Sequence, residues 1–336
     1  MKGLIAVDGG GTKTEFILAD VNGNVLATKK YRGTNLNSVS FEDAFTTLEQ
    51  GLYDMSELAM NNNIEIAGVY FGLAGGVNGK NAEIVYNYFK NKYFQNIPFS
   101  NAGDDLNAIN AGVKNSPNGI AVIAGTGSNV MLKKDGKVLP NPQLSGWGYL
   151  FDKGASGFDF GRDAIIAAKK DMNGTGKKTI IRKMLEDKFK ASVFDSLKEV
   201  YSRGVDYVAS LAPIVFDAYR MGDEVAKEII EEEFQCVAEM INNGHDIIGR
   251  DVDAKVGLLG GIFSHEAEIV RPLMKKMLHS NLTVNIPQES QIYGALMEAA
   301  KNAGVPADSK FLSHYHDTIK NPIIQSGPVG YEKNNI

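Results

Sequence analysis

Apolar and polar residues near the N-terminus follow a pattern that is typical of β-strands joined by short turns. The apolar stretches 3–7 and 14–21 are separated by three consecutive glycines. The second stretch ends at Asn22–Gly23, a dipeptide that favours tight hairpin turns, and a further strand is expected over 25–31. The first thirty residues therefore predict a hairpin extended by a third strand.

Apolar residues at spacings of three and four predict a helix after these strands. This spacing runs from Phe41 to Ala59, and Ser40 precedes it as a helix cap. A buried strand is expected over 66–76 and a second helix over 81–93. The N-terminal half is therefore predicted to be α/β.

The same pattern returns in the second half of the chain. Residues 119–139 contain an apolar strand, a glycine-rich turn, a second strand and an Asp-Gly turn. Helices are expected through most of 160–250, a strand with a glycine turn at 254–263, and helices at 264–278 and 289–304. Two similarly built α/β domains are predicted, and 336 residues suit about two domains.

The composition limits which binding partners and which cellular compartment we expect for this protein. The net charge of -5 gives no reason to expect nucleic acid or an anionic membrane as partner. No apolar run approaches the roughly 20 residues of a membrane-spanning helix, and the N-terminus lacks the features of a signal peptide. The single cysteine, Cys236, forms no intrachain disulfide, which fits a reducing compartment. We expect a cytoplasmic protein.

The first glycine turn, DGGGTKT at 8–14, matches neither of two familiar nucleotide-binding fingerprints. Lys13 follows Thr12 where a P-loop has glycine, and a strand follows where a dinucleotide fold needs a helix. A plain hairpin turn is one interpretation. The other is a phosphate-binding turn, in which bare glycine backbone approaches an anion and Asp8 holds Mg²⁺ through water.

Two further glycine turns follow, and each is a weak signal alone. The turn AGTGSN at 124–129 repeats the first in an equivalent setting, so the pair could hold a polyphosphate from two sides. The turn at 257–266 has Gly260 and Gly261 ahead of a helix that we expect Ser264 to cap. It suits an adenosine and its α-phosphate, or it simply starts a helix.

Asp104 and Asp105 stand at the start of a predicted helix. One interpretation is that one of them caps the helix. The other is that a carboxylate here is the catalytic base that takes the proton from a hydroxyl attacking a γ-phosphate.

Six motifs in order carry a resemblance to a known family. They are DGGGTKTE, GLAGG, NAGDDLNAINAG, AGTGSN, SGWGYLFDKGASG and GLLGGI. The set, spanning residue 3 to about 303, resembles the actin–hexokinase superfamily. Within it, the chain resembles the BadF/BadG/BcrA/BcrD ATPase branch, which holds N-acetylglucosamine kinases, glucosamine kinases and activator ATPases of 2-hydroxyacyl-CoA dehydratases. The resemblance implies an α/β fold of two ribonuclease-H-like domains facing across an ATP and sugar cleft.

The domains implied are an N-terminal domain over 1–112 and a C-terminal domain over 113–290. A helix at 291–304 returns to the N-terminal domain, and 305–336 is expected to be a loosely packed polar tail. A homodimer is also implied.

The resemblance assigns ligands to residues of this chain. Asp8 would hold Mg²⁺ through water as the one metal contact from the protein, so ATP and Mg²⁺ are the cofactors expected. The residues expected to bind ATP are Asp8, Gly9, Gly10, Gly11, Thr12, Lys13, Gly125, Thr126, Gly127, Ser128, Gly260, Gly261 and Ile262.

The catalytic base implied is Asp104, because Ala108 and Ala111–Gly112 then match the motif of the amino-sugar kinases; Asp105 is the alternative. The residues expected to contact the sugar are Thr34, Asn35, Gly75, Gly76, Asp104, Asp105, Trp147, Asp152 and Ser156. A core position for Trp147 and a solvated loop position for Asp152 are the alternatives.

One segment departs from the family pattern. The family reads Gly-Asp-Glu-Gly-Ser-Gly where this chain has FDKGASG, so Lys153 replaces a glutamate and Ala155 is an extra residue. A lysine here could favour a sugar that carries a carboxylate, such as N-acetylmuramic acid.

The activity implied is ATP-dependent phosphorylation of the 6-hydroxyl of N-acetylglucosamine, with N-acetylmuramic acid as a further hypothesis and glucosamine kinase as the alternative. An activator ATPase needs cysteine ligands for an iron–sulfur cluster, typically about four, and a dimer of this chain supplies only its two copies of Cys236. A non-catalytic sugar or nucleotide sensor is the remaining alternative, and the presence of Asp104 with both phosphate turns opposes it.

Overall fold

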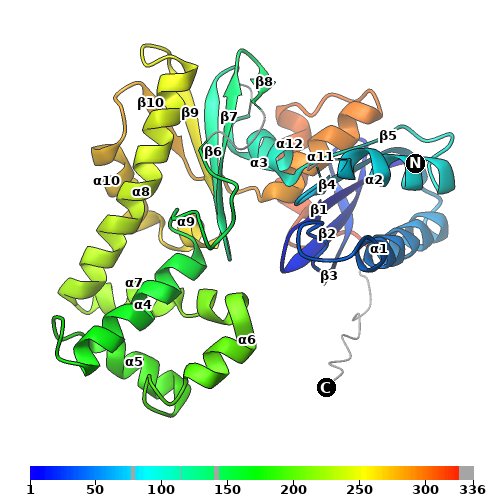
Figure 1. Ribbon diagram of the computed structural model, residues 1–336. Coiled ribbons are helices and arrows are strands. Elements are labelled where there is room, and N and C mark those ends of the chain that lie inside the picture. The colour runs from blue at the N-terminus through cyan, green and yellow to red at the C-terminus, as the bar shows by residue number, and fades with distance from the viewer. Residues whose placement is uncertain (77–79, 115, 140–143, 325–336) are drawn as a thin grey trace. The chain divides into compact units, whose positions relative to one another are not determined.

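The computed structural model describes residues 1–76, 80–114, 116–139 and 144–324 (Figure 1). Its contacts divide the chain into two compact units. Unit 1 contains Met1–Asn110 together with the chain from Gln291 onward, and unit 2 contains Ala111–Ser290. The sequence analysis places these divisions after residues 112 and 290.

Unit 1 is built on a five-stranded mixed sheet with the order β3-β2-β1-β4-β5. The central strand β1 pairs antiparallel with β2 and parallel with β4, and β4 pairs parallel with β5. The strands are β1 (Lys2–Gly9), β2 (Lys13–Asp20), β3 (Val25–Arg32), β4 (Glu65–Leu73) and β5 (Phe99–Ala102). The three N-terminal strands and β4 follow the prediction, whereas the short β5 was not predicted.

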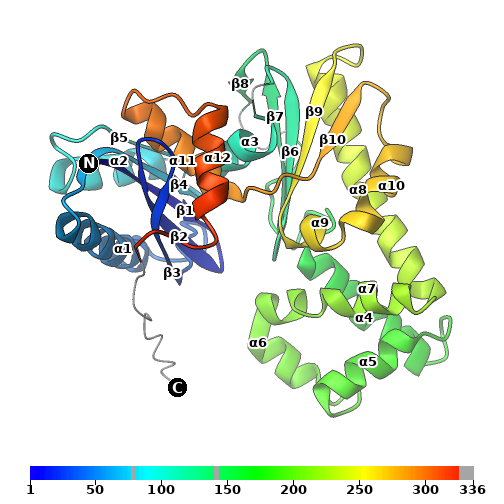
Figure 2. The same ribbon diagram turned by 180° about the vertical axis from the view of Figure 1, so that it is seen from behind.

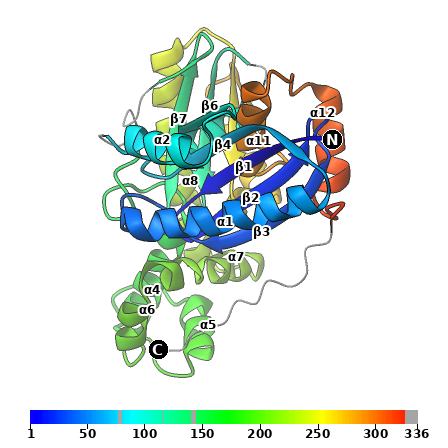
Figure 3. The same ribbon diagram turned by 90° about the vertical axis from the view of Figure 1, so that its right-hand side faces the viewer.

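Helices cover both faces of this sheet. Alternate residues of β1 point to opposite faces, so Ile5 and Val7 pack in the cluster with α1 and α2, while Leu4 and Ala6 pack in the cluster with α11 and α12 (Figure 3). The helices are α1 (Phe41–Asn61), α2 (Asn81–Lys92), α3 (Asp104–Gly112), α11 (Gln291–Asn302) and α12 (Ser309–Thr318). Ser40 caps α1, as predicted.

Unit 2 repeats the sheet of unit 1. Its order is β10-β9-β6-β7-β8, in which β6 pairs antiparallel with β7 and parallel with β9. The strands are β6 (Gly119–Ala124), β7 (Ser128–Lys134), β8 (Lys137–Val138), β9 (Ala254–Leu259) and β10 (Leu282–Asn285). Thus β6 corresponds to β1, and the predicted repetition of the N-terminal pattern is confirmed.

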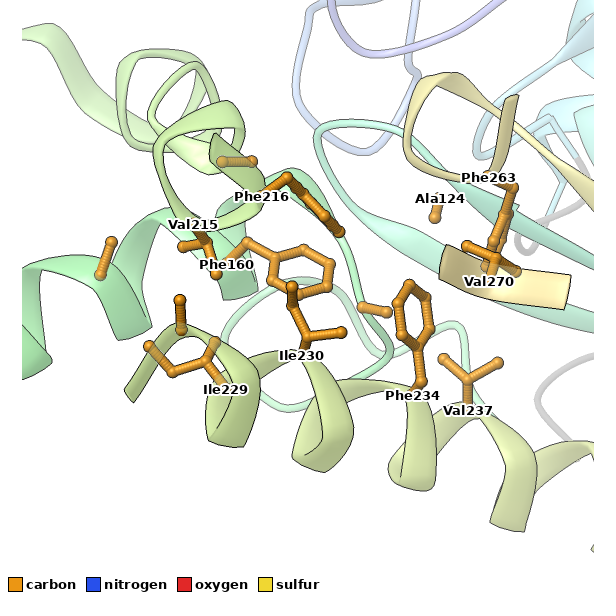
Figure 4. Packing of buried hydrophobic residues seen from close by; sticks show 14 of the residues in the cluster. Ala124, Phe160, Val215, Phe216, Ile229, Ile230, Phe234, Val237, Phe263 and Val270 are labelled. Atoms are coloured by element: carbon orange, nitrogen blue, oxygen red, sulfur yellow. The ribbon is translucent and has the colours of Figure 1, made fainter. Parts of the chain in front are cut away.

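The large helical part of unit 2 packs around one core. Phe160 lies 4.8 Å from Phe216 and 5.8 Å from Phe234 between ring centroids, and Phe234 continues toward Phe263 (Figure 4). The helices are α4 (Gly157–Met172), α5 (Ile180–Phe189), α6 (Leu197–Ala209), α7 (Ala212–Arg220), α8 (Glu224–Ile248), α9 (Gly261–His265) and α10 (Ala267–Met277). In the described part of the chain, no helix is both long and apolar enough to cross a membrane.

The helix predicted over 264–278 differs from the structure in two ways. It is divided into α9 and α10, and α9 begins three residues earlier than expected, with Gly260 at its N-cap. Ser264 therefore does not cap the helix; its hydroxyl donates to the carbonyl of Gly261 within α9.

The prediction of a loosely packed tail from residue 305 is wrong for residues 305–324, which the structure describes. Asp308 caps α12, and Phe311 and Tyr315 are each 2% exposed on the face of α12 that packs toward α11 (Figure 2). The backbone N–H of Ile324 also donates to Leu26 of β3. Phe311 and Tyr315 are four residues apart, so they lie on the same face of this short helix. The polar composition of the segment gave no indication of this apolar face. Residues 325–336 lie outside the described residues.

We predict that Phe311→Ala lowers the free energy of unfolding by about 3–5 kcal/mol, because it removes a fully buried ring from the core of unit 1. Urea unfolding measures this loss. The control is Lys310→Ala on the exposed side of the same helix, which should change little. A small, equal effect of both changes would contradict the packing of α12.

Candidate functional site

Three loops meet at the carboxyl ends of β1 and β4 in unit 1. The N–H of Ala74 donates to Gly9 over 2.7 Å, the N–H of Thr34 donates to Gly10 over 3.0 Å, and the N–H of Leu36 donates to Ala74 over 3.0 Å. Residues expected to bind ATP phosphates and residues expected to contact the sugar are thus joined by backbone hydrogen bonds, although they are far apart in sequence.

The sugar loop at 33–35 contributes differently from the prediction. Thr34 is fully buried, and its hydroxyl is 2.9 Å from that of Thr14 beneath the glycine turn. Thr34 therefore supports the turn, and its side chain is not presented to a ligand. Asn35 is half-buried, and its Oδ1 accepts the N–H of Asn37.

Gly75 and Gly76 are required by local packing. Gly75 has a φ of +71°, and a Cβ there would lie 2.8 Å from Asn37 Oδ1. A Cβ on Gly76 would lie 2.6 Å from the carbonyl oxygen of Leu73. Both glycines allow the loop after β4 to close onto its neighbours.

The glycines of the first turn fall into two groups. Gly9 is required by the fold, because a Cβ there would lie 2.3 Å from Thr34 Oγ1. Gly33, which the sequence analysis did not assign, is required because its Cβ would lie 1.9 Å from the carbonyl oxygen of Gly11. By contrast, a Cβ on Gly10 or Gly11 would meet its nearest atom at 3.5 Å or 4.0 Å. Neither of these two has a positive φ.

The turn in unit 2 shows the same feature. Gly125 and Gly127 are exposed, have no positive φ, and a Cβ on either would meet nothing within 4 Å. Internal packing and backbone conformation therefore do not account for glycine at these two positions. A backbone left bare toward solvent fits a ligand that approaches the N–H groups closely.

The second turn is held from below by α4. The N–H of Gly157 donates to Gly125 over 2.7 Å, and the N–H of Phe158 donates to Thr126 over 3.1 Å. Ser128 lies at the start of β7, and a Cβ on Gly154 would come within 2.5 Å of its hydroxyl.

Gly260 brings the third turn beside the second. It has a φ of +104°, and a Cβ there would lie 2.2 Å from the carbonyl oxygen of Ala124. Gly261 is exposed and Ile262 is half-buried against the core of unit 2. The residues at 125–128 and 260–262 that were expected to bind ATP therefore lie together within unit 2.

Two aspartates of the candidate site in unit 1 have raised pKa values. Asp8 ends β1, and burial raises its pKa to about 6, an effect that a hydrogen bond from Asn107 partly opposes. Asp104 is the first residue of α3, and burial, followed by the charges of Asp105 and Asp8, raises its pKa to about 8. The two carboxylates are therefore close enough to influence each other.

A self-bonded loop carries Trp147 and Asp152. One carboxylate oxygen of Asp152 accepts the N–H groups of Gly146, Trp147 and Gly148 at 2.8, 2.7 and 3.2 Å. Trp147 is 67% exposed, so the alternative of a core aromatic is wrong. Asp152 therefore holds its own loop together through these three hydrogen bonds. It is not the merely solvated loop carboxylate that was the alternative.

Ser156 is not placed to contact a sugar through its hydroxyl. It is 1% exposed and caps α4, where its Oγ donates to Asp159 Oδ2 and accepts the N–H of Asp159. The signal was present in the sequence, because Ser156 and Asp159 have the spacing of a capping box.

Lys153 points to acidic residues of its own unit. Its ammonium lies 2.6 Å from Glu232, 3.2 Å from Glu233 and 3.7 Å from Asp163. Lys153 and Glu232 line a cavity of about 430 Å³ beside α4 and α8 that includes none of the residues expected to bind ATP or sugar. This pairing removes the reason for expecting Lys153 to recognise a sugar carboxylate.

Glu233 is a residue that the sequence analysis missed. Its side chain is fully buried, it accepts the N–H of Ala155 over 3.1 Å, and Ala155 has a φ of +55°. Burial, followed by the charge of Asp159, raises the pKa of Glu233 to about 8. A glutamate on the apolar face of α8 was the available signal.

The two sheets and their common topology define a two-domain α/β protein of the actin–hexokinase type. The chain belongs to the BadF/BadG/BcrA/BcrD ATPase family, whose sequence profile matches residues 5–299.

Two characterised relatives are sugar kinases. An N-acetyl-D-glucosamine kinase of Dictyostelium discoideum is 24% identical over 290 residues, which are 82% of this chain and 90% of the relative. An N-acetylmuramic acid/N-acetylglucosamine kinase of Clostridium acetobutylicum is 30% identical over 237 residues, which are 69% of this chain and 76% of the relative.

Solved structures support the same fold. A candidate N-acetylglucosamine kinase from Porphyromonas gingivalis has a TM-score of 0.70 at 20% identity, covering 89% of this chain and 99% of that one. A ROK family glucokinase from Streptomyces griseus in complex with glucose and AMPPNP has a TM-score of 0.58 at 18% identity, with coverage of 89% and 99%.

We predict that Lys153→Met lowers the free energy of unfolding by about 2 kcal/mol. This is less than the roughly 3–5 kcal/mol lost when a fully buried ion pair is broken, because the Lys153 side chain is 33% exposed. Urea unfolding measures the loss. Above the Glu233 pKa of about 8, adding Glu233→Gln should recover part of it, since the unpaired buried charge is then removed. Lys170→Met, at the wall of the same cavity, is the control.

We predict that Gly127→Ala leaves the unfolding free energy nearly unchanged but weakens nucleotide binding about tenfold or more, equal to about 1.4 kcal/mol. The new methyl meets no protein atom but occupies the space above the turn. Calorimetric titration with a non-hydrolysable ATP analogue measures the affinity. Urea unfolding of the same variant is the control, because Gly127 has no positive φ and the new methyl group should leave the folded state unstrained. Unchanged affinity would refute a role for the 125–127 backbone in phosphate binding.

Proposed function

We propose that this protein is an ATP-dependent N-acetylhexosamine kinase that transfers the γ-phosphoryl group of ATP to the 6-hydroxyl of N-acetylglucosamine. Membership of an ATPase family and two relatives that are kinases for this sugar support the proposal. The observation that carries it is a half-buried carboxylate, Asp104, in electrostatic contact with Asp8 at the end of β1, next to the glycine turn that follows that strand.

Asp104 is the proposed catalytic base. The sugar 6-hydroxyl oxygen forms a bond to the γ-phosphorus, the bond from that phosphorus to the bridging oxygen of ADP breaks, and the hydroxyl proton passes to Asp104. A raised pKa makes the ionised carboxylate a stronger proton acceptor than an ordinary aspartate. The charge of Asp105 raises the pKa of Asp104. The proposed role of Asp105 is therefore to make Asp104 more basic, and the proposed role of Asp104 is to accept the proton.

The glycine turns are the proposed phosphate-binding elements. The N–H groups of Gly10 and Gly125 donate to Lys13 and Gly127 within the turns. Other N–H groups of the two turns would bind phosphate oxygens, with the Thr12 hydroxyl and the Lys13 ammonium as further donors. Lys13 is mostly exposed and lies 3.2 Å from Glu15, a surface pair that a phosphate can displace at low cost. The turn at 260–262 is proposed to contact the adenosine.

Asp8 fits a magnesium ion bound together with ATP. The described residues contain no group of three metal-ligating side chains, but Mg²⁺ in phosphoryl transfer commonly uses one or two carboxylates, with phosphates and water completing its shell. Only Oδ1 of Asp8 accepts the Asn107 amide, so the other oxygen can face a ligand. When bound, Mg²⁺ offsets the charge of the phosphates.

Asn35, Trp147 and the loop held by Asp152 are the proposed sugar contacts. N-acetylmuramic acid stays a second candidate substrate because one relative phosphorylates it by name, and glucosamine is the third. Turnover measured with glucose, glucosamine, N-acetylglucosamine and N-acetylmuramic acid separates these candidates. A sensor that has lost catalysis would neither hydrolyse ATP nor phosphorylate a sugar with any of these four compounds present.

An activator ATPase is disfavoured within the same family. Cys236, the only cysteine of the chain, is in α8, and burial raises the pKa of its thiol, whereas cluster ligation needs thiolates. Protein purified without oxygen should therefore be colourless.

We predict that Asp104→Asn lowers kcat by about 10²–10⁴ while the Kd for N-acetylglucosamine stays within a few fold, because the amide cannot accept the proton. Asp105→Asn should retain most of the activity. In the unsubstituted protein, kcat should rise with pH toward a plateau above about 8, where Asp104 is ionised. Steady-state kinetics and sugar titration measure these effects. Wild-type kcat in Asp104→Asn with loss in Asp105→Asn would reverse the two roles.

A further inference from the structure

Asn107 connects the two elements that carry the proposed catalytic aspartates. It lies on α3, three residues after Asp104, and its side chain is fully buried. Its Nδ2 donates to Asp8 Oδ1 over 2.6 Å, across 99 positions of sequence. The end of β1 and the first turn of α3 are thus joined by one short hydrogen bond.

Two glycines provide the space for this contact. Gly72 of β4 is the register partner of Asp8, and a Cβ on Gly72 would lie 2.2 Å from Asn107 Nδ2. Gly294 of α11 approaches the backbone, and a Cβ there would lie 1.9 Å from the carbonyl oxygen of Asn107. A strand and a helix from distant parts of the chain therefore both accommodate this asparagine.

The orientation of the amide is determined by Asp8. Among the described residues, Oδ1 of Asn107 is buried and accepts no hydrogen bond. Leaving an acceptor unsatisfied costs about 1–3 kcal/mol, so the pairing of Nδ2 must offset that cost. A reversed amide would place its oxygen against the carboxylate of Asp8, which is repulsive.

We propose that Asn107 is a positioning residue that holds the Asp8 carboxylate by hydrogen bonding and ties it to the helix that presents Asp104. The catalytic part of this inference rests on the proposed kinase function, whereas the coupling between Asn107 and Asp8 does not.

Several charged groups surround Asp8. Glu15 and Lys13 of β2 act on its pKa in opposite directions, and Asp104 of α3 interacts with it. Tyr70 of β4, which is influenced by Asp8 and by Glu298 of α11, also faces this region. These groups are the same in a variant that changes Asn107 alone, so a difference between the variant and the unsubstituted protein reports on the hydrogen bond.

The first test measures urea unfolding at one pH for Asn107→Leu, Asp8→Ala and the double variant. If Nδ2 of Asn107 holds the Asp8 carboxylate, the two changes should not be additive. Asn107→Leu should lower the folding equilibrium constant about tenfold more in the unsubstituted protein than in the Asp8→Ala background. Equal losses in both backgrounds would overturn the proposal and leave Asn107 a packing residue.

Asn107→Asp is the second variant if the leucine variant does not fold. At pH 8 it places two carboxylates against each other, so it should lower the folding equilibrium constant about tenfold or more. Adding Asp8→Asn removes one of the two charges and should restore most of the loss. A loss that Asp8→Asn does not relieve would also overturn the coupling.

The second test measures kcat and KM for Mg-ATP at one pH. Asn107→Leu should lower kcat/KM for Mg-ATP about tenfold. The matched control Asn110→Leu, whose amide instead contacts Glu298 of α11, should change it little. Equal, small effects of the two changes would refute the catalytic part. If the unsubstituted protein turns over ATP with no sugar, the kinase proposal fails, and the unfolding test still decides the role of Asn107.

Discussion

The parallel pairing of β1 with β4 is the constraint on which unit 1 depends. Its register places Asp8 opposite Gly72, and the loops that leave the two strands close onto each other through the hydrogen bond from Ala74 to Gly9. Since β1 is buried on both faces, a one-residue slip would exchange its two apolar faces and move Asp8 away from α3. The same pairing therefore fixes both the core and the position of a carboxylate.

Unit 2 uses the same sheet but supports its glycine turn by other means. The turn after β1 rests on Thr34 and Gly33, whereas the turn after β6 rests on the first N–H groups of α4 and on the close approach of Gly260 to Ala124. Repetition of the sheet thus preserves the location of the turn, while the surrounding loops that hold it differ. In both units, the turn has glycines at which a Cβ would meet no atom closer than 3.5 Å.

Buried polar groups link these turns to the helices. Asn107 joins Asp8 to α3, and Glu233 joins the segment before α4 to α8 through Ala155 and Lys153. Each of these polar groups is removed from water, which costs free energy. That free energy is offset only because the hydrogen-bonding and charged partners are held in place. Such contacts set local geometry near the candidate site more narrowly than apolar packing does, because hydrogen bonds are directional.

Local pattern in the sequence determined the strands of both hairpins, the helices α1, α8 and α11, and the repetition of the sheet, since period and turn residues are local properties. It also indicated the glycine turns. Only the tertiary structure decided that Thr34 is a buried support, that Lys153 is paired with acids, and that α12 packs on the sheet. Edge strands β5 and β10 have four residues each, too few for a period to appear. The physical reason is that the partners of a polar side chain, such as Asp8 for Asn107, are brought together by strand register and helix packing across long stretches of chain.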